Sequence, residues 1–151
     1  MDIGSKNGYP ANALSNFTPH PFELDGIYCA SMEGFLQALK FENPDVQAEV
    51  CKLTGLAAKR RGGKRNKAWK REQSLWWRGR KMDRGGHEYQ QLLDRAYRAM
   101  FNQSDSFRRA LKATQKATLT HSIGKSKPSD TVLTVSEFCR RLTQLRDELT
   151  D

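Results

Sequence analysis

Three polar side chains, Glu33, Gln37 and Lys40, recur four and three residues apart in the stretch SMEGFLQALK. At about 100° per residue on a helix, they form one polar stripe. A carboxylate in such a stripe can stabilise a cation, attack as a nucleophile or act as a base on water. We expect Glu33 to be ionised, because the first helical turn favours a negative charge. The alternative is a solvated Glu–Lys pair, which commonly stabilises a helix surface.

The segment before the stripe predicts a β-hairpin over residues 21–30. Asp25-Gly26 is a favoured two-residue turn in that segment. The turn fixes a register that leaves one face apolar, and we expect this face to lie on the core. The pairs in this register are Phe22 with Cys29, Glu23 with Tyr28, and Leu24 with Ile27.

Helical periodicity dominates the rest of the chain. Ser31 is a helix cap, Asn43-Pro44 begins a second helix, and Thr134 with Glu137 forms a capping box. Further helices are expected over residues 69–78, 89–100 and 107–111, and a loop is expected over 120–134. The sequence therefore predicts an α+β fold that is predominantly α. It would be a single compact multihelical domain over residues 1–151, with a small N-terminal β-hairpin.

Composition narrows the function classes. The formal net charge of +9 attracts polyanions, which include nucleic acid, nucleotides and acidic proteins, without choosing among them. No apolar run reaches 18 residues, so we expect no membrane contact. The opening MDIGSKNGYP lacks the pattern of a secretory signal, and we expect a cytoplasmic protein.

The cysteines and histidines do not predict a metal site or a disulfide framework. Three cysteines without a CxxC pair fit reduced thiols. The three histidines show no ligand spacing to one another or to the cysteines. We expect no metal and no cofactor, and the oligomeric state stays open.

A basic run occupies residues 59–71, KRRGGKRNKAWKR, where eight of thirteen residues are basic and none is acidic. Arginines bind phosphate and tryptophan offers a face to a base, so Arg60, Arg61 and Trp69 are candidate substrate contacts. The Gly62-Gly63 pair suggests a flexible loop whose amides approach a phosphate. The alternative is a solvated charged face.

The order LSNF, PFELDG and SMEGFLQALKF resembles the N-terminal signature of the NADAR family, also called YbiA-like. The match is specific over residues 12–41 and looser over 59–111. Gly34 stands where that family usually has a histidine. The C-terminal third diverges, because LTHSIGKSKPSDTVLT at residues 119–134 replaces the family's later motifs.

The resemblance implies an N-glycosidase that separates a ribose phosphate from a base or amine. Implied substrates are ADP-ribosylated guanine, in nucleic acid or nucleotide, and phosphoribosyl intermediates of riboflavin synthesis. Glu33 would stabilise the cationic sugar, and Lys40 would hold phosphate, tune Glu33 or form a salt bridge with it. Asn16, Phe17 and Gln37 are candidate substrate contacts. His121 and Asp130 are candidate proton donors to the leaving base.

Structural roles compete with each of these assignments. Asn16 is also typical of a turn, Phe17 of a core, and His121 of a loop. At the level of the whole protein, the alternative is a non-catalytic module that binds ADP-ribose, a nucleotide or nucleic acid. Such a module would be insensitive to loss of the Glu33 charge, whereas an enzyme would not be.

Overall fold

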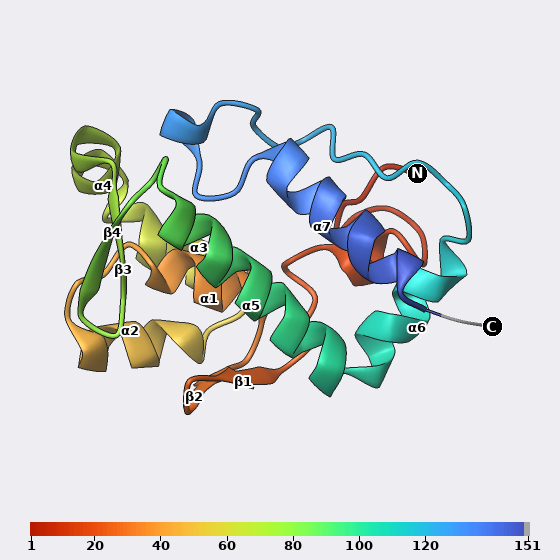
Figure 1. Cartoon of the computed structure of the whole chain (residues 1–151), viewed down its shortest axis with the longest axis horizontal. Helices are drawn as coiled ribbons and strands as arrows, with labels where there is room; N and C mark the ends of the chain where they lie inside the picture. The colour runs from red at the N-terminus through yellow and green to blue at the C-terminus, as the bar shows by residue number, and fades with distance from the viewer. Residues whose placement is uncertain (150–151) are drawn as a thin grey trace.

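The computed structural model describes residues 1–149, which fold into seven α-helices and two small antiparallel sheets of two strands each (Figure 1). The predicted fold class, α+β and predominantly α, is confirmed. The helices are α1 (Met32–Ala38), α2 (Pro44–Cys51), α3 (Gly55–Gly63), α4 (Asn66–Glu72), α5 (His87–Gln103), α6 (Asp105–Ala113) and α7 (Val135–Asp147). The strands are β1 (Phe22–Leu24), β2 (Ile27–Cys29), β3 (Ser74–Trp77) and β4 (Arg80–Asp83), and short 3₁₀ turns cover Asn12–Leu14 and Pro128–Asp130.

The first hairpin has the predicted register, with Phe22 opposite Cys29. Asp25 and Gly26 both have positive φ, of 53° and 80°, which is the conformation of a tight turn matched to strand twist. Trp77 donates a hydrogen bond from Nε1 to Asp25 Oδ2 at 2.8 Å. The turn is therefore fixed to the second sheet as well as to its own strands.

The helix predicted over residues 69–78 is wrong beyond Glu72. Gln73 takes a left-handed conformation, with φ of 54°, and ends α4. Arg78 and Gly79 have φ of 53° and 84° and make the turn between β3 and β4. Aromatic residues before a tight turn favour a strand, and this signal outweighed the helical periodicity.

Helix α1 runs through the middle of the molecule, with α2 and α3 packed against it (Figure 1). Ser31 caps it as predicted, since its Oγ accepts from the Gly34 amide at 3.0 Å. All of α1 except Glu33 is buried, and Phe35 has no exposed surface. Gln37 and Lys40 on its polar stripe are therefore buried, while Glu33 is half-buried.

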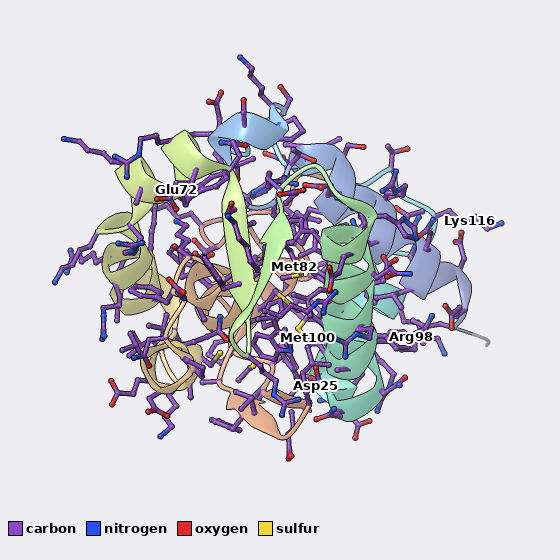
Figure 2. All side chains as sticks on the ribbon, turned by 60° about the vertical axis from the view of Figure 1, so that its left-hand side comes forward. Asp25, Glu72, Met82, Arg98, Met100 and Lys116 are labelled. Carbon is purple, nitrogen blue, oxygen red and sulfur yellow. The ribbon has the colours of Figure 1, made fainter. Side chains whose placement is uncertain are left out.

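The remaining core forms around α5, the longest helix. Its apolar stripe is buried, as the sequence pattern predicts, and the helix packs on β1, α6 and α7. Figure 2 shows Met82 and Met100 directed into the interior, while Arg98 and Lys116 lie at the surface. Within the described part of the chain, no helix is both long and apolar enough to cross a bilayer.

Gly34 allows α1 to approach the end of α2. A Cβ at this position would lie 2.4 Å from the Leu53 carbonyl oxygen and 3.0 Å from that of Cys51. The histidine usual in the NADAR pattern therefore does not fit this packing, which depends on glycine.

We expect Gly34→Ala to lower the free energy of unfolding by about 1–3 kcal/mol, because the backbone must shift to accept the methyl group. Urea unfolding measures this change. Gly85→Ala is the matched control, because a Cβ there meets nothing within 4 Å. Equal stability of the two variants would contradict the close approach.

Candidate functional site

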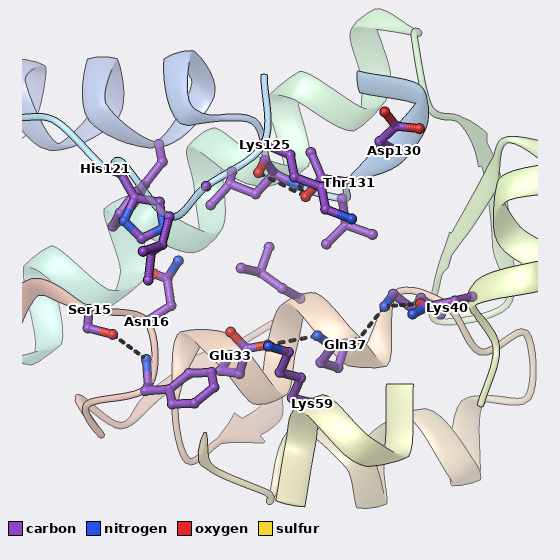
Figure 3. A pocket seen from close by; sticks show the side chains of 18 of the residues that line it. Ser15, Asn16, Glu33, Gln37, Lys40, Lys59, His121, Lys125, Asp130 and Thr131 are labelled. Carbon is purple, nitrogen blue, oxygen red and sulfur yellow. Dashed lines mark hydrogen bonds between the residues drawn. The ribbon is translucent and has the colours of Figure 1, made fainter. Parts of the chain in front are cut away.

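A cavity of about 380 Å³ opens above α1, between that helix and the loop preceding α7 (Figure 3). It brings together most of the candidate residues, although they come from opposite ends of the chain. Those that line it are Asn16, Phe17, Glu33, Gln37, Lys40, Trp69, His121 and Asp130.

The polar stripe on α1 is a connected chain of hydrogen bonds. Gln37 Nε2 donates to Glu33 Oε2 at 2.7 Å, and Lys40 Nζ donates to Gln37 Oε1 at 2.7 Å. Lys40 also donates to Asn66 Oδ1 at 2.7 Å. Gln37 thus lies between the two charged groups and hydrogen-bonds to both. It takes the place of the direct salt bridge considered from the sequence.

Glu33 is the half-buried end of this chain. Burial raises the pKa of its carboxyl above the usual 4.5, while the Gln37 hydrogen bond and the charges of Lys40 and Lys59 oppose that rise. Desolvation therefore opposes the effect of the helix start, and the expectation that Glu33 is ionised stays a prediction. A carboxylate with a raised pKa in a cavity is a recurrent feature of functional sites.

Lys40 is almost completely buried, at 6 % exposure. Burial lowers the pKa of its ammonium group to about 8; the Glu33 charge opposes this effect, and Lys70 and Lys125 add to it. Two of its three protons have acceptors, in Gln37 and Asn66. The third has no acceptor among the described residues and is available to a ligand in the cavity.

Three further lysines, Lys59, Lys70 and Lys125, line the cavity. Within residues 1–149, none of them has an acidic partner within salt-bridge distance. The sequence had singled out Arg60 and Arg61 instead, and the structure does not place these two along the cavity. The basic run lies on α3 and α4, so the predicted flexible loop at Gly62-Gly63 is wrong.

Asn16 supports α1 from the segment before the first hairpin. Its carbonyl oxygen accepts from the Glu33 amide at 3.1 Å. Its side-chain Oδ1 accepts from the Tyr97 hydroxyl at 2.9 Å. Phe17, the next residue, is half-buried, and its amide donates to Ser15 Oγ at 3.2 Å.

His121 reaches the same end of the cavity from the long loop (Figure 3). Its Nδ1 lies 2.8 Å from the Ile3 carbonyl oxygen. Because a carbonyl only accepts, Nδ1 carries the proton, and in the neutral ring Nε2 is an acceptor. His121 can therefore donate a proton from Nε2 only when the ring is doubly protonated.

Asp130 and Trp69 lie toward the other end. Asp130 is exposed on a 3₁₀ turn, and Figure 3 shows it above Lys40, not above Glu33. Trp69 lines the cavity but is 3 % exposed, so most of its side chain packs in the core. Asp130 is thus poorly placed to protonate a group held beside Glu33.

Sequence reasoning missed Asn66, Lys125 and Tyr97 as parts of the site. Asn66 lies 26 residues from the lysine that it accepts from, and Tyr97 lies 81 residues from its partner asparagine. No local spacing reports contacts of this range. The sequence indicated Lys59 and Lys70 only as members of the basic run, not as individual site residues.

Gly62 keeps Gln37 in position. A Cβ on Gly62 would lie 1.8 Å from Gln37 Oε1 and 2.8 Å from its Cβ, so the glutamine would have to leave. We expect Gly62→Ala to break the hydrogen-bond chain between Glu33 and Lys40 and to cut ligand affinity or turnover by roughly 10-fold or more.

Gly63→Ala is the matched control for this prediction. It lies on the same turn of α3, and its added methyl group would approach only Asn66 Nδ2, at 4.0 Å. Calorimetric titration with ADP-ribose and thermal unfolding of both variants separate a site effect from a stability effect. Equal affinities in the two variants would contradict the role of Gly62.

The profile of the family described as "Bacteriophage protein GP30.3" matches residues 8–147. The chain belongs to this family. It is 38% identical over 150 residues to the "Uncharacterized 17.1 kDa protein in Gp30-rIII intergenic region" of Enterobacteria phage T4, covering 99% of this chain and 98% of that protein.

The fold is similar to that of the E. coli protein YbiA, solved by NMR. The TM-score is 0.63 at 21% identity, covering 98% of this chain and 83% of YbiA. GP30.3 proteins are NADAR-like, so the resemblance found at residues 12–41 is confirmed. The fold and family together indicate a glycosidase-type or related function.

Proposed function

We propose that this protein is a hydrolase that cleaves the N-glycosidic bond between a ribose phosphate, including ADP-ribose, and a base or amine. The observation that carries the proposal is the Glu33 carboxylate, which lies in a cavity of about 380 Å³ beside lysines that have no acidic partner within residues 1–149. Family membership adds to this support.

The chemistry requires a negative charge beside the anomeric carbon. As the C–N bond lengthens, positive charge builds on the sugar ring. The Glu33 carboxylate would stabilise that charge and orient the attacking water. Its partial burial strengthens the interaction relative to one in bulk solvent.

Lys40, Lys70 and Lys125 would bind the phosphate part of the substrate. Lys70 and Lys125 lie close enough to Lys40 to depress its pKa, which means that the three form one cluster of positive charge. An anion bound there relieves their mutual repulsion. Gln37 sets the separation between this cluster and Glu33.

The leaving base takes its proton from water or from Nε2 of a doubly protonated His121. Asp130 contributes charge near the phosphate end and is not assigned this step, because Figure 3 places it away from Glu33. The proposal therefore assigns His121 a secondary role.

The decisive experiment incubates the purified protein with ADP-ribosylated guanine, in oligonucleotide and free-nucleotide form, and with phosphoribosyl riboflavin intermediates. Chromatography follows the released base or amine. Release of the base with wild-type protein supports the proposal. Absence of product from every substrate, together with ADP-ribose binding that survives Glu33→Gln, would favour the non-catalytic binding module.

The pH profile of kcat/KM should be bell-shaped. On the acid side, activity is lost as Glu33 takes up a proton, at a pH above the ordinary 4.5 because burial raises its pKa. On the alkaline side, activity is lost as the pH rises through about 8, where Lys40 loses the charge that holds phosphate. Steady-state rates across this range measure both limbs.

Lys40→Arg separates the alkaline limb from other causes. The guanidinium stays charged far above pH 8, so the alkaline limb should disappear from the measured range even where the overall rate falls. A wild-type profile that stays flat through pH 8 would contradict the assignment to Lys40.

A further inference from the structure

A buried tyrosine lies directly behind the cavity. Tyr97, on α5, is 1 % exposed, and its hydroxyl donates to Asn16 Oδ1 at 2.9 Å. Within residues 1–149 this is the one hydrogen bond that the hydroxyl makes. Asn16 in turn lines the cavity, and its carbonyl oxygen holds the amide of Glu33.

We propose that Tyr97 is a positioning residue that fixes the Asn16 amide with Nδ2 facing the cavity, so that the site selects a leaving base with a hydrogen-bond acceptor beside the glycosidic bond. The proposal rests on the proposed function, because it assigns the base to the Glu33 end of the cavity. The acceptor that Asn16 Nδ2 would recognise on the base is a carbonyl oxygen or an unprotonated ring nitrogen.

The hydrogen-bonding requirement of Tyr97 sets the orientation of the amide. A buried hydroxyl proton needs an acceptor, and an unsatisfied one is costly. If the amide were reversed, Nδ2 would face the Tyr97 hydroxyl. The hydroxyl proton would then have no acceptor. Burial also raises the pKa of Tyr97 well above its ordinary value, so the hydroxyl remains a donor at any working pH.

The other end of the amide is left for the substrate. Asn16 is half-buried, and its Nδ2 has no hydrogen-bond partner among the described residues. Nδ2 has two protons and no lone pair to offer, so it pairs with acceptors and not with exocyclic amines. The contact therefore discriminates between bases by what they present at that position.

A double-mutant cycle tests the link between the two residues. With the substrate that is turned over, Tyr97→Phe should lower kcat/KM by roughly 5- to 20-fold when Asn16 is present. In the Asn16→Ala background the same change should have no further effect. An equal loss in both backgrounds would overturn the proposal, because Tyr97 would then act through packing alone.

Tyr89→Phe is the matched control. Tyr89 is also fully buried on α5, and its hydroxyl donates to the Val132 carbonyl oxygen and not to Asn16. Its effect should be the same with Asn16 and with Ala at position 16. Coupling of similar size for both tyrosines would count against a specific role for Tyr97.

An NMR measurement separates this proposal from the proposed function. In asparagine-labelled protein, the side-chain amide signals of Asn16 should shift in Tyr97→Phe and stay in place in Tyr89→Phe. Unchanged Asn16 signals in Tyr97→Phe would overturn the positioning role whether or not a substrate is turned over. A shift of the Asn16 signals in a protein that turns over no substrate would support the positioning role of Tyr97 and reject the proposed glycosidase activity.

Discussion

Replacing Glu33 with glutamine should lower kcat by roughly 10²–10⁴-fold while ADP-ribose binding changes little. Glutamine keeps the shape of the side chain, and its Oε1 can still accept from Gln37 Nε2. What is lost is the negative charge that meets the sugar as it becomes cationic. The interaction exists mainly in the transition state, so the loss should fall on kcat and not on KM.

The same variant should also change the titration of Lys40. The Glu33 charge now raises the pKa of Lys40 against the effect of burial. Without it, that pKa should fall below its present value of about 8, and the alkaline limb of the residual activity should move to lower pH. Rates of Glu33→Gln across pH measure this shift.

Glu49→Gln is the control for charge removal. Glu49 lies on the exposed side of α2 and does not line the cavity. Glu49→Gln also removes one negative charge from the protein. An effect of net charge alone would therefore appear in both variants. A similar loss of kcat in both, or none in Glu33→Gln, would reject the assigned role of the carboxylate.

Local sequence signals predicted the α1 half of this site well. The Asp25-Gly26 turn, the Ser31 cap and the stripe of three polar residues all follow from spacing over fewer than ten residues. The three residues of that stripe do line the cavity, whereas their spacing alone left a solvated pair as the alternative. The resemblance to NADAR proteins then supplied a chemistry that spacing alone does not contain.

The other half depends on contacts between distant segments, which the sequence does not display. The loop over residues 120–134 was expected, but nothing in it revealed that Lys125 would lie above α1. The position of a residue on its helix likewise says little about burial, and burial rather than the helix start dominates the pKa of Glu33. At β3 the error was local, because the helical periodicity was followed although the aromatic residues and the turn at Arg78-Gly79 favour a strand.

Arg84→Met should be the most destabilising single substitution that we predict, at about 3–5 kcal/mol in the free energy of unfolding. Arg84 is 2 % exposed and forms a double hydrogen bond to Glu137, at 2.7 and 3.1 Å. Its Nε donates to the Thr131 carbonyl oxygen at 2.9 Å. Methionine fills similar space but removes the charged partner of the Glu137 carboxylate, which would keep the Thr134 amide and Gln90 as donors. It also removes the arginine donor to the part-buried Thr131 carbonyl.

Arg80→Met provides the comparison, because Arg80 pairs with Glu88 at the surface, and exposed pairs contribute about 0–1 kcal/mol. Urea unfolding of both variants at neutral pH gives the two values. A cost for Arg84→Met no larger than that for Arg80→Met would show that the buried pair is not a major source of stability.

The buried pair also determines acid stability. Burial acts to raise the pKa of Glu137, but hydrogen bonds from Arg84, the Thr134 amide and Gln90 outweigh it and lower the pKa to about 2. Because this folded value lies below the usual 4.5, the stabilisation is complete above pH 4.5. It is lost as the pH falls toward 2.

Removing both charges of the Arg84–Glu137 pair should lower the free energy of unfolding less than removing the arginine charge alone. In Arg84→Met with Glu137→Gln, no uncompensated charge stays buried, and glutamine still completes the capping box at the start of α7. The double variant should therefore be more stable than Arg84→Met alone. If instead it is less stable, the penalty of Arg84→Met comes from the lost Thr131 contact, and the arginine acts mainly by holding the loop that carries Lys125 to the cavity.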